Sequence, residues 1–184
     1  MPLPPTIDRE EIHHRQISMK AWRRCDGLYD IEAHLVDTKP FPFQRLMRPD
    51  PVAPGEPLHD LWLRLVLDGD FTVREIVAAA DVTPFELCRQ ATATLSVLVG
   101  ERIGPGWSKI VRERLRGNAS CTHLAELMLP IATTALQGIR GVRPASDRFE
   151  SGSGARPGMI DTCFALDAGR EVVAAVWPQH RRKP

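Results

Sequence analysis

Six side chains of the kinds that bind metal ions or move protons are scattered over this sequence, and no two of them form a compact metal-binding motif. They are Glu32, His34, His59, Cys88, Cys121 and His123. Imidazole and thiolate groups are intermediate to soft ligands, so a His, Cys, Cys set suits zinc or iron. We expect folding to assemble a metal site whose ligands are His59, Cys88, Cys121, His123 and His34.

Three of these residues occupy positions that favour reactivity. Cys121 is predicted to begin a helix, where exposed amides and the helix dipole favour a thiolate, either as a ligand or as a nucleophile. His123 and Glu126 then occupy neighbouring positions on that helix and suit a ligand with a supporting carboxylate, or an acid and a base. His59 follows a proline turn and precedes Asp60 at the head of a predicted strand. The structural alternatives are a buried cysteine and a solvated polar face.

Alternating polar and apolar residues predict two β-hairpins, and each contains an Asp-Gly pair that favours a tight turn. The first hairpin joins residues 15–24 to 28–37, and the second joins residues 59–67 to 71–79. Six prolines within residues 38–57 exclude a helix or a central strand there and predict a long loop.

Glu32 and Asp60 are the candidate catalytic residues. Side chains alternate along a strand, so Glu32 and His34 share one face of strand 28–37. If this face lines the metal site, Glu32 or Asp60 would act as a general base. The alternative is a polar strand that faces solvent.

Helical patterns follow the hairpins. Residues 83–86, Thr-Pro-Phe-Glu, combine a capping residue, a proline at the first helical position and a glutamate, and they predict a helix over residues 83–100. Further helices are predicted over residues 107–116 and 121–137, the latter kinked by Pro130. Hairpins followed by helices predict an α+β fold, an antiparallel sheet with helices packed on one face.

We expect one domain with loose ends. Residues 1–12 form a flexible N-terminal arm and residues 13–140 form the α+β core. A flexible connection over residues 141–158 leads to a C-terminal hairpin over residues 159–178 that completes the same domain. A basic tail follows at residues 179–184.

Three stretches carry a family resemblance: DGLYDIEAHLVDTK at residues 26–39, GEPLHD at residues 55–60 and CTHL at residues 121–124. With these stretches the sequence resembles a bacterial family known as a domain of unknown function, number 2889. This resemblance implies kinship and no particular reaction.

The middle of the chain, about residues 54–136, also resembles the IscU and NifU type of iron–sulfur scaffold protein. That family presents a cysteine and an aspartate after a turn, a second cysteine near a helix start and a third at a later helix. The matching positions here are His59 with Asp60, Cys88 and Cys121. The histidine in place of the first cysteine argues against cluster assembly, and the resemblance implies an IscU/NifU-like metal pocket.

Composition excludes several classes of partner. The 184 residues carry 24 basic and 23 acidic side chains, and the net charge of +1 gives no basic face for nucleic acid. No apolar run approaches the roughly 20 residues that span a bilayer, and the N-terminus lacks the pattern of a signal peptide. We expect no nucleic acid, no membrane and a cytoplasmic location, where the four cysteines stay reduced.

The expected function is that of a cytoplasmic metal-binding protein, with zinc or iron, that acts as a metal-dependent enzyme on a small molecule. The metal would polarise a carbonyl or activate water while Glu32 or Asp60 moves a proton. Two other classes stay open. One is a non-catalytic metal or iron–sulfur accessory protein, and the other is a metal-free binding module whose cysteines and histidines are core residues.

Overall fold

The computed structural model describes residues 7–143 and 156–183. Its contacts divide the chain into two compact units, residues 1–139 and residues 140–184. Residues 7–12, part of the predicted N-terminal arm, are exposed and have no regular secondary structure. All the strands of the described residues lie in the first unit.

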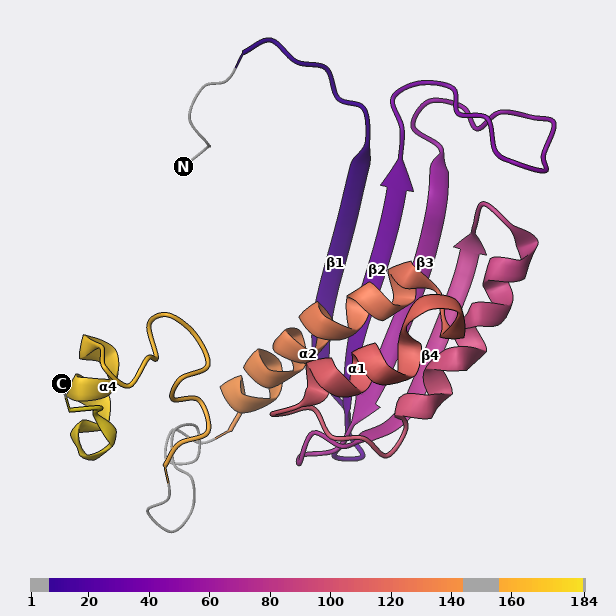
Figure 1. Ribbon diagram of the computed structural model, residues 1–184. Coiled ribbons are helices and arrows are strands. Elements are labelled where there is room, and N and C mark those ends of the chain that lie inside the picture. The colour runs from indigo at the N-terminus through magenta and orange to yellow at the C-terminus, as the bar shows by residue number, and fades with distance from the viewer. Residues whose placement is uncertain (1–6, 144–155, 184) are drawn as a thin grey trace. The chain divides into compact units, whose positions relative to one another are not determined.

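One antiparallel sheet with the strand order β1-β2-β3-β4 forms the base of the first unit (Figure 1). β1 His14–Arg23 pairs with β2 Tyr29–Thr38, and β3 Pro57–Leu67 pairs with both β2 and β4 Val73–Val82. Gly27 in the first turn has a φ of 87°, which glycine adopts without strain. Both predicted hairpins are confirmed, with strand ends shifted by a few residues.

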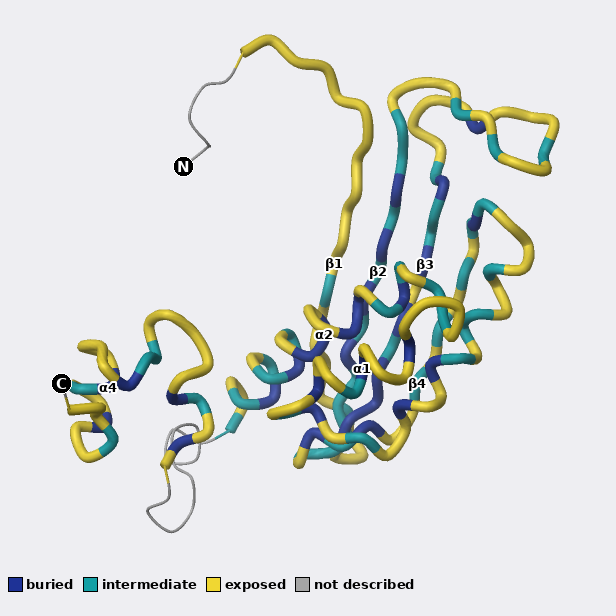
Figure 2. The backbone as a smooth tube through the Cα atoms, in the orientation of Figure 1, coloured by how far each residue is buried: buried dark blue, intermediate teal, exposed yellow. Residues whose placement is uncertain are grey.

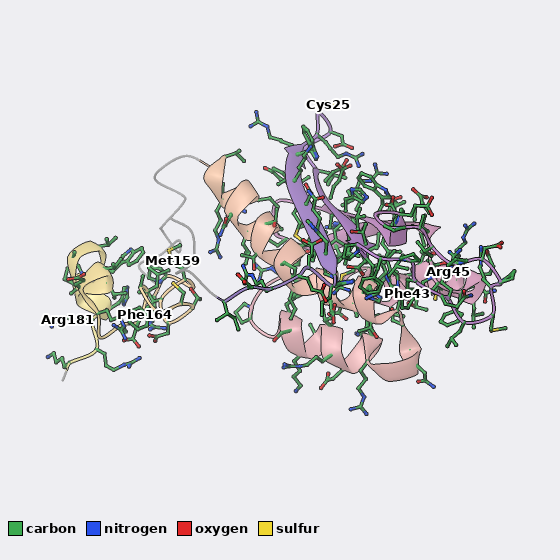
Figure 3. All side chains as sticks on the ribbon, turned by 90° about the horizontal axis from the view of Figure 1, so that it is seen from above. Cys25, Phe43, Arg45, Met159, Phe164 and Arg181 are labelled. Atoms are coloured by element: carbon green, nitrogen blue, oxygen red, sulfur yellow. The ribbon has the colours of Figure 1, made fainter. Side chains whose placement is uncertain are left out.

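A long loop of residues 39–56 joins β2 to β3, as the prolines predict. Phe43 and Val52 form a bridge across this loop, with N–O distances of 3.0 and 2.9 Å. Figure 3 labels Phe43 and Arg45 on this loop and Cys25 at the turn between β1 and β2. The loop leads directly into the start of β3, which carries His59.

The helices of the first unit pack on one face of the sheet (Figure 1). They are η1 Glu86–Leu98, α1 Trp107–Leu115, η2 Gly117–Ala119 and α2 Thr122–Gly141. Buried side chains of β2 and β3 meet those of α2 in one core, which includes Ile31, Leu35, Leu61, Leu63, Leu65, Leu124, Leu127, Met128 and Ile131. Figure 2 shows long buried stretches in β2 and β3. The predicted α+β fold with helices on one face is confirmed.

The segment after β4 differs in detail from its prediction. The helix begins at Glu86, and the Thr83 hydroxyl donates to the carbonyl of Phe85 at 2.8 Å instead of capping a helix. η1 is a 3-10 helix in which the hydroxyls of Thr92, Thr94 and Ser96 donate to carbonyls three residues earlier, at 2.7–2.9 Å. Such side-chain bonds compete with α-helical pairing and accompany the tighter winding.

The predicted C-terminal hairpin is wrong. Residues 159–170 form turns, and α4 Glu171–Val176 and η4 Pro178–His180 follow in place of a second strand. The apolar run that was assigned to a strand can equally place residues four apart on one face of a helix, and it buries Val173 and Trp177 with Ile160 in a separate small core. These residues belong to the second compact unit, so they do not complete the first domain. Most of the predicted connection over residues 141–158 lies outside the described residues.

No helix within the described residues is both long enough and apolar enough to cross a bilayer.

A close approach of α2 to β1 yields a stability prediction. A Cβ added at Gly138 would lie 2.6 Å from the Cβ of Ala21. We expect Gly138→Ala to destabilise the protein, because overpacking costs about 1–3 kcal/mol and outweighs the roughly 1 kcal/mol that alanine gains in a helix. Urea unfolding would measure the change. Gly141→Ala, which meets open space, is the matched control and should show no loss, and a Gly138→Ala protein as stable as the wild type would contradict the packing.

Candidate functional site

Three strands contribute one row of side chains to the inner face of the sheet, the face on which the helices pack. Arg15 on β1 pairs with Asp37 on β2, and Asp37 pairs with His59 on β3. Side chains that stand opposite each other in antiparallel strands share a face. Asp37 continues the alternate buried positions of β2, so a carboxylate occupies a place where the pattern would put an apolar side chain.

Asp37 is the centre of this row. Its side chain is 1% exposed and accepts two hydrogen bonds from Arg15, Nε to Oδ1 at 2.7 Å and Nη2 to Oδ2 at 2.9 Å. His59 Nδ1 lies 3.1 Å from Oδ2, and His13 Nε2 lies 3.3 Å from Oδ1. Arg15 also donates from Nη1 to Glu126 at 3.1 Å, which ties the first strand to α2.

The start of α2 brings a cysteine and a histidine to the same place. The carbonyl of Cys121 accepts the first helical bond, from the amide of Ala125 at 2.9 Å, so Cys121 caps the helix. His123 Nε2 lies 3.8 Å from Asp37 Oδ2, and its ring centroid lies 4.0 Å from that of His59. Cys121 Sγ lies 3.9 Å from His123 Nδ1.

A pocket of about 680 Å³ opens beside these groups. Its volume falls in the range of small-molecule sites. Its wall comes from the start of β3, from the segment that leads into η1, from η1 itself and from the residues around the start of α2. The lining residues are His59, Leu61, Thr83, Pro84, Phe85, Leu87, Cys88, Gln90, Ala91, Thr94, Asn118, Ser120, Cys121, Thr122, His123 and Leu124.

Electrostatic interactions keep the Asp37–Arg15 pair ionised. Burial alone would raise the pKa of Asp37, but the hydrogen bond and charge of Arg15, with smaller contributions from His59 and His13, lower it below its ordinary value. The pKa of Arg15 is raised in turn, chiefly by the hydrogen bond to Asp37. Arg15 thus neutralises a carboxylate that almost no water reaches.

His59 is held neutral near pH 7. Burial lowers its pKa, and the positive charge of a protonated His123 lowers it further, while Asp37 offsets only part of the effect. A neutral imidazole is the form that binds a metal ion.

Cys121 and His123 stabilise each other's charged forms. Burial raises the pKa of the Cys121 thiol, but the hydrogen bond with His123 and the amides of Leu124 and His123 outweigh it, so the pKa is lowered. The same hydrogen bond with Cys121 raises the pKa of His123 against the effect of burial. The pair therefore favours a thiolate next to an imidazolium.

Asp37, His59 and His123 form a candidate metal-binding triad. One ligand atom of each lies within 4.8 Å of those of the other two. Ligands about 2.0–2.2 Å from one metal ion lie roughly 3 to 4 Å apart. The separations of 3.1 and 3.8 Å from Asp37 Oδ2 to the two imidazoles agree with this spacing.

The predicted ligands do not all join this triad. Of the described residues, His59, Cys88, Cys121 and His123 line the same pocket. The group of ligand atoms close enough for one ion, however, contains Asp37 in place of the two cysteines. The structure therefore brings His59 and His123 together as expected and places Cys121 beside them.

The other predicted residues lie on the opposite face of the sheet. His34 Nε2 lies 2.7 Å from Asp60 Oδ1, and the His34 ring stacks on Trp62 with centroids 3.6 Å apart. Glu32 accepts a hydrogen bond from Trp22 Nε1 at 3.0 Å. Glu32, His34 and Asp60 are thus separated from the pocket by the sheet, because they alternate with the buried residues of β2 and β3.

Sequence reasoning missed Asp37 and Arg15. The sequence pattern contained a signal for Asp37, because this residue occupies the next position along the apolar face of its strand. The symmetry of the hairpin about its turn places Arg15 opposite Asp37. A charged pair at one row of an otherwise apolar face is the pattern that would have found them.

The fold and the site together define an α+β protein with a histidine and carboxylate cluster beside a pocket. The family model described as "Protein of unknown function (DUF2889)" matches residues 13–137, which include the whole cluster, and the chain belongs to this family. No curated protein and no solved structure gives a match. The resemblance to the family of unknown function is therefore confirmed at the level of the family, whereas the resemblance to IscU and NifU scaffolds has no support.

The buried ion pair predicts a pH-dependent stability. Arg15→Met leaves the buried Asp37 carboxylate without its main partner, and removing one member of a buried pair costs about 3 kcal/mol. Asp37 then has a higher pKa in the folded variant than in the folded wild type. The difference in unfolding free energy should therefore narrow as the pH falls through the range between these two pKa values, because a protonated Asp37 no longer needs the guanidinium.

Denaturant unfolding of both proteins between pH 7 and pH 3 would measure this difference. Arg24→Met is the control, since Arg24 pairs with the exposed Asp26 and the partly exposed Asp30 near the hairpin turn. A constant difference across the pH range would contradict the role of Arg15.

The Cys121–His123 pair predicts an unusual thiol. In protein freed of metal with a chelator, alkylation of Cys121 by iodoacetamide should have its pH midpoint below the ordinary pKa of cysteine, because the thiolate is the reactive form. His123→Asn should move the midpoint to higher pH. Peptide mass spectrometry would follow each cysteine separately, and an unchanged midpoint in His123→Asn would exclude the proposed stabilisation.

Proposed function

We propose that this chain binds a zinc or iron ion through Asp37, His59 and His123 and acts as a metal-dependent enzyme on a small molecule in the adjoining pocket. One observation carries the proposal. Two histidines and a carboxylate, delivered by β2, β3 and α2, have ligand atoms within 4.8 Å of one another, and both histidines line the pocket.

The charge of the cluster is compatible with a cation. Arg15 contacts two carboxylates, Asp37 and Glu126, which together exceed its single positive charge. An ionised carboxylate has about four lone-pair sites, so Asp37 can keep its bonds to Arg15 while Oδ2 also faces a metal ion. A neutral His59 has a nitrogen lone pair for a metal ion, and His123 would release the proton that Cys121 favours when it binds the ion.

Three protein ligands with an open position are typical of catalytic zinc, and two histidines with one carboxylate are typical of non-haem iron. Such an ion would polarise a carbonyl group or activate a water molecule. Cys121 lines the pocket next to His123 and is the group placed to move a proton or attack a bound molecule. Glu32 and Asp60 lie on the other face of the sheet and do not take this role.

A cytoplasmic location is part of the proposal. The four cysteines are all free, which suits a reducing compartment.

A second candidate is a non-catalytic protein that holds or transfers a metal ion or a cluster. It is favoured by the presence of both Cys88 and Cys121 in the wall of the pocket that His59 lines. The two candidates differ in their ligands, since the first uses Asp37 and the second uses the cysteines.

Metal content tests the proposal. We expect tag-free protein to hold close to one zinc or iron ion per chain by mass spectrometry, and His59→Ala and Asp37→Asn to hold at least tenfold less, because each removes one of three ligands. His34→Ala, on the opposite face, is the matched control and should keep the metal. Circular dichroism would verify that the variants fold.

The cysteines separate the two candidates. Cys121→Ser and Cys88→Ser should retain the metal if Asp37, His59 and His123 are the ligands, and should lose it if the thiols bind it. A folded wild-type protein that contains no metal and takes up neither added zinc nor ferrous iron would contradict both candidates.

A further inference from the structure

We infer that the pocket beside the triad takes an uncharged, largely apolar small molecule whose polar end faces His59, Cys121 and His123. This inference deepens the proposed function and rests on it only for which end of the ligand reacts. The choice of ligand class rests on the pocket wall alone.

The described residues of the wall carry no net charge, because their ion pair, the thiolate of Cys121 with the imidazolium of His123, is neutral as a whole. Among the described residues that line the pocket there is no lysine, arginine, aspartate or glutamate. Arg15 offsets part of the charge of Asp37 and Glu126 behind the histidines, and none of the three residues appears in the lining. A carboxylate, phosphate or ammonium group on the ligand would therefore lose water without gaining an unpaired opposite charge, and this costs far more than burying an apolar group.

The hydroxyl groups of Thr83, Thr94 and Ser120 in the wall are already engaged with the protein. Thr94 donates to the carbonyl of Ala91 or to the hydroxyl of Ser120, both at 2.7 Å. Thr83 donates to the carbonyl of Phe85 at 2.8 Å. The side of the pocket formed by the segment leading into η1 consequently presents mainly carbon atoms to a ligand.

Apolar side chains also surround the pocket where it meets solvent. Phe85 is 38% exposed and Leu87 is 70% exposed, and both line the pocket. Leu61 and Leu124, each 1% exposed, close its inner end. An apolar ligand would cover the first pair and contact the second, which is the arrangement found in small-molecule sites.

The polar groups converge on one side. His59 comes from the start of β3, and Cys121 and His123 come from the start of α2. The His123 ring centroid lies 4.0 Å from that of His59, and His123 Nδ1 lies 3.9 Å from Cys121 Sγ. A neutral carbonyl or hydroxyl group on the ligand can exchange hydrogen bonds with these groups, whereas the rest of the molecule stays against the apolar wall. The ligand class that fits is a neutral aromatic or aliphatic carbonyl compound or alcohol.

Three probes with the same ring system test this inference: 2-acetylnaphthalene, 2-naphthoate and 2-(aminomethyl)naphthalene. Their affinities for the full chain would be measured by fluorescence titration and saturation-transfer NMR. The protein would first be freed of metal, because an added ion would attract the carboxylate. We expect the neutral probe to bind at least tenfold more tightly than either charged probe.

Substitutions at two positions on η1, Ala91 and Leu87, test whether the probes bind in this pocket. Ala91→Trp fills the pocket and should weaken binding of the neutral probe at least tenfold. Ala93→Trp is the matched control, since Ala93 is exposed and lies outside the lining, and it should leave the affinity unchanged. Leu87→Glu adds a charge at an exposed lining position where folding is not at risk, and it should weaken the neutral probe and strengthen the ammonium probe at least threefold.

Binding of 2-naphthoate as tight as that of the neutral probe, or unchanged affinities in both Ala91→Trp and Leu87→Glu, would overturn the inference. The outcome is independent of metal content. A protein that binds no metal but selects the neutral probe would refute the proposed function and leave the ligand class standing. A protein that binds metal through the triad but prefers a charged probe would support the proposed metal site and refute the ligand class.

Discussion

The carboxylate of Asp37 has almost no contact with solvent, and its charge must be compensated within the protein. Arg15 on β1 supplies the opposite charge, and the imidazoles of His59 on β3 and His123 on α2 lie close to the same carboxylate. One buried charge thereby requires three strands and the longest helix to meet at one point. The register of the sheet, the position of α2 and the convergence of the two histidines all depend on satisfying this group.

The same constraint explains why the reactive groups gather at one end of the inner face. Apolar residues of β2, β3 and α2 fill the rest of that face, so polar groups are tolerated only where they satisfy one another. Arg15 offsets part of the negative charge of Asp37 and Glu126 behind the histidines, while Cys121 and His123 offset each other's charges at the helix start. Among the described residues, the wall of the pocket next to them has no lysine, arginine, aspartate or glutamate, and its Cys121–His123 pair has no net charge. A metal ion and a neutral ligand are therefore compatible neighbours in this arrangement.

The sheet also divides the polar residues into two groups with different roles. His34, Asp60 and Trp62 form a connected set on the opposite face, held by a 2.7 Å hydrogen bond and by ring stacking. Their side chains satisfy one another at a partly exposed surface, and this gives them a sufficient structural role. Residues adjacent in sequence, such as His59 and Asp60, thus serve opposite faces, because neighbouring side chains of a strand point in opposite directions.

The sequence by itself determined the hairpins, the order of the elements, the helix that begins after Cys121 and the α+β class, because these depend on local alternation, turn residues and helix periodicity. It also identified His59 and His123 as candidate ligands. It did not determine the C-terminal unit, where a short apolar run fits a strand or a helix equally well. Tertiary structure alone decided which face of β2 and β3 meets α2. That choice brought Asp37 and Arg15 into the site and separated Glu32, His34 and Asp60 from it, since the face that is buried is set by packing between distant segments.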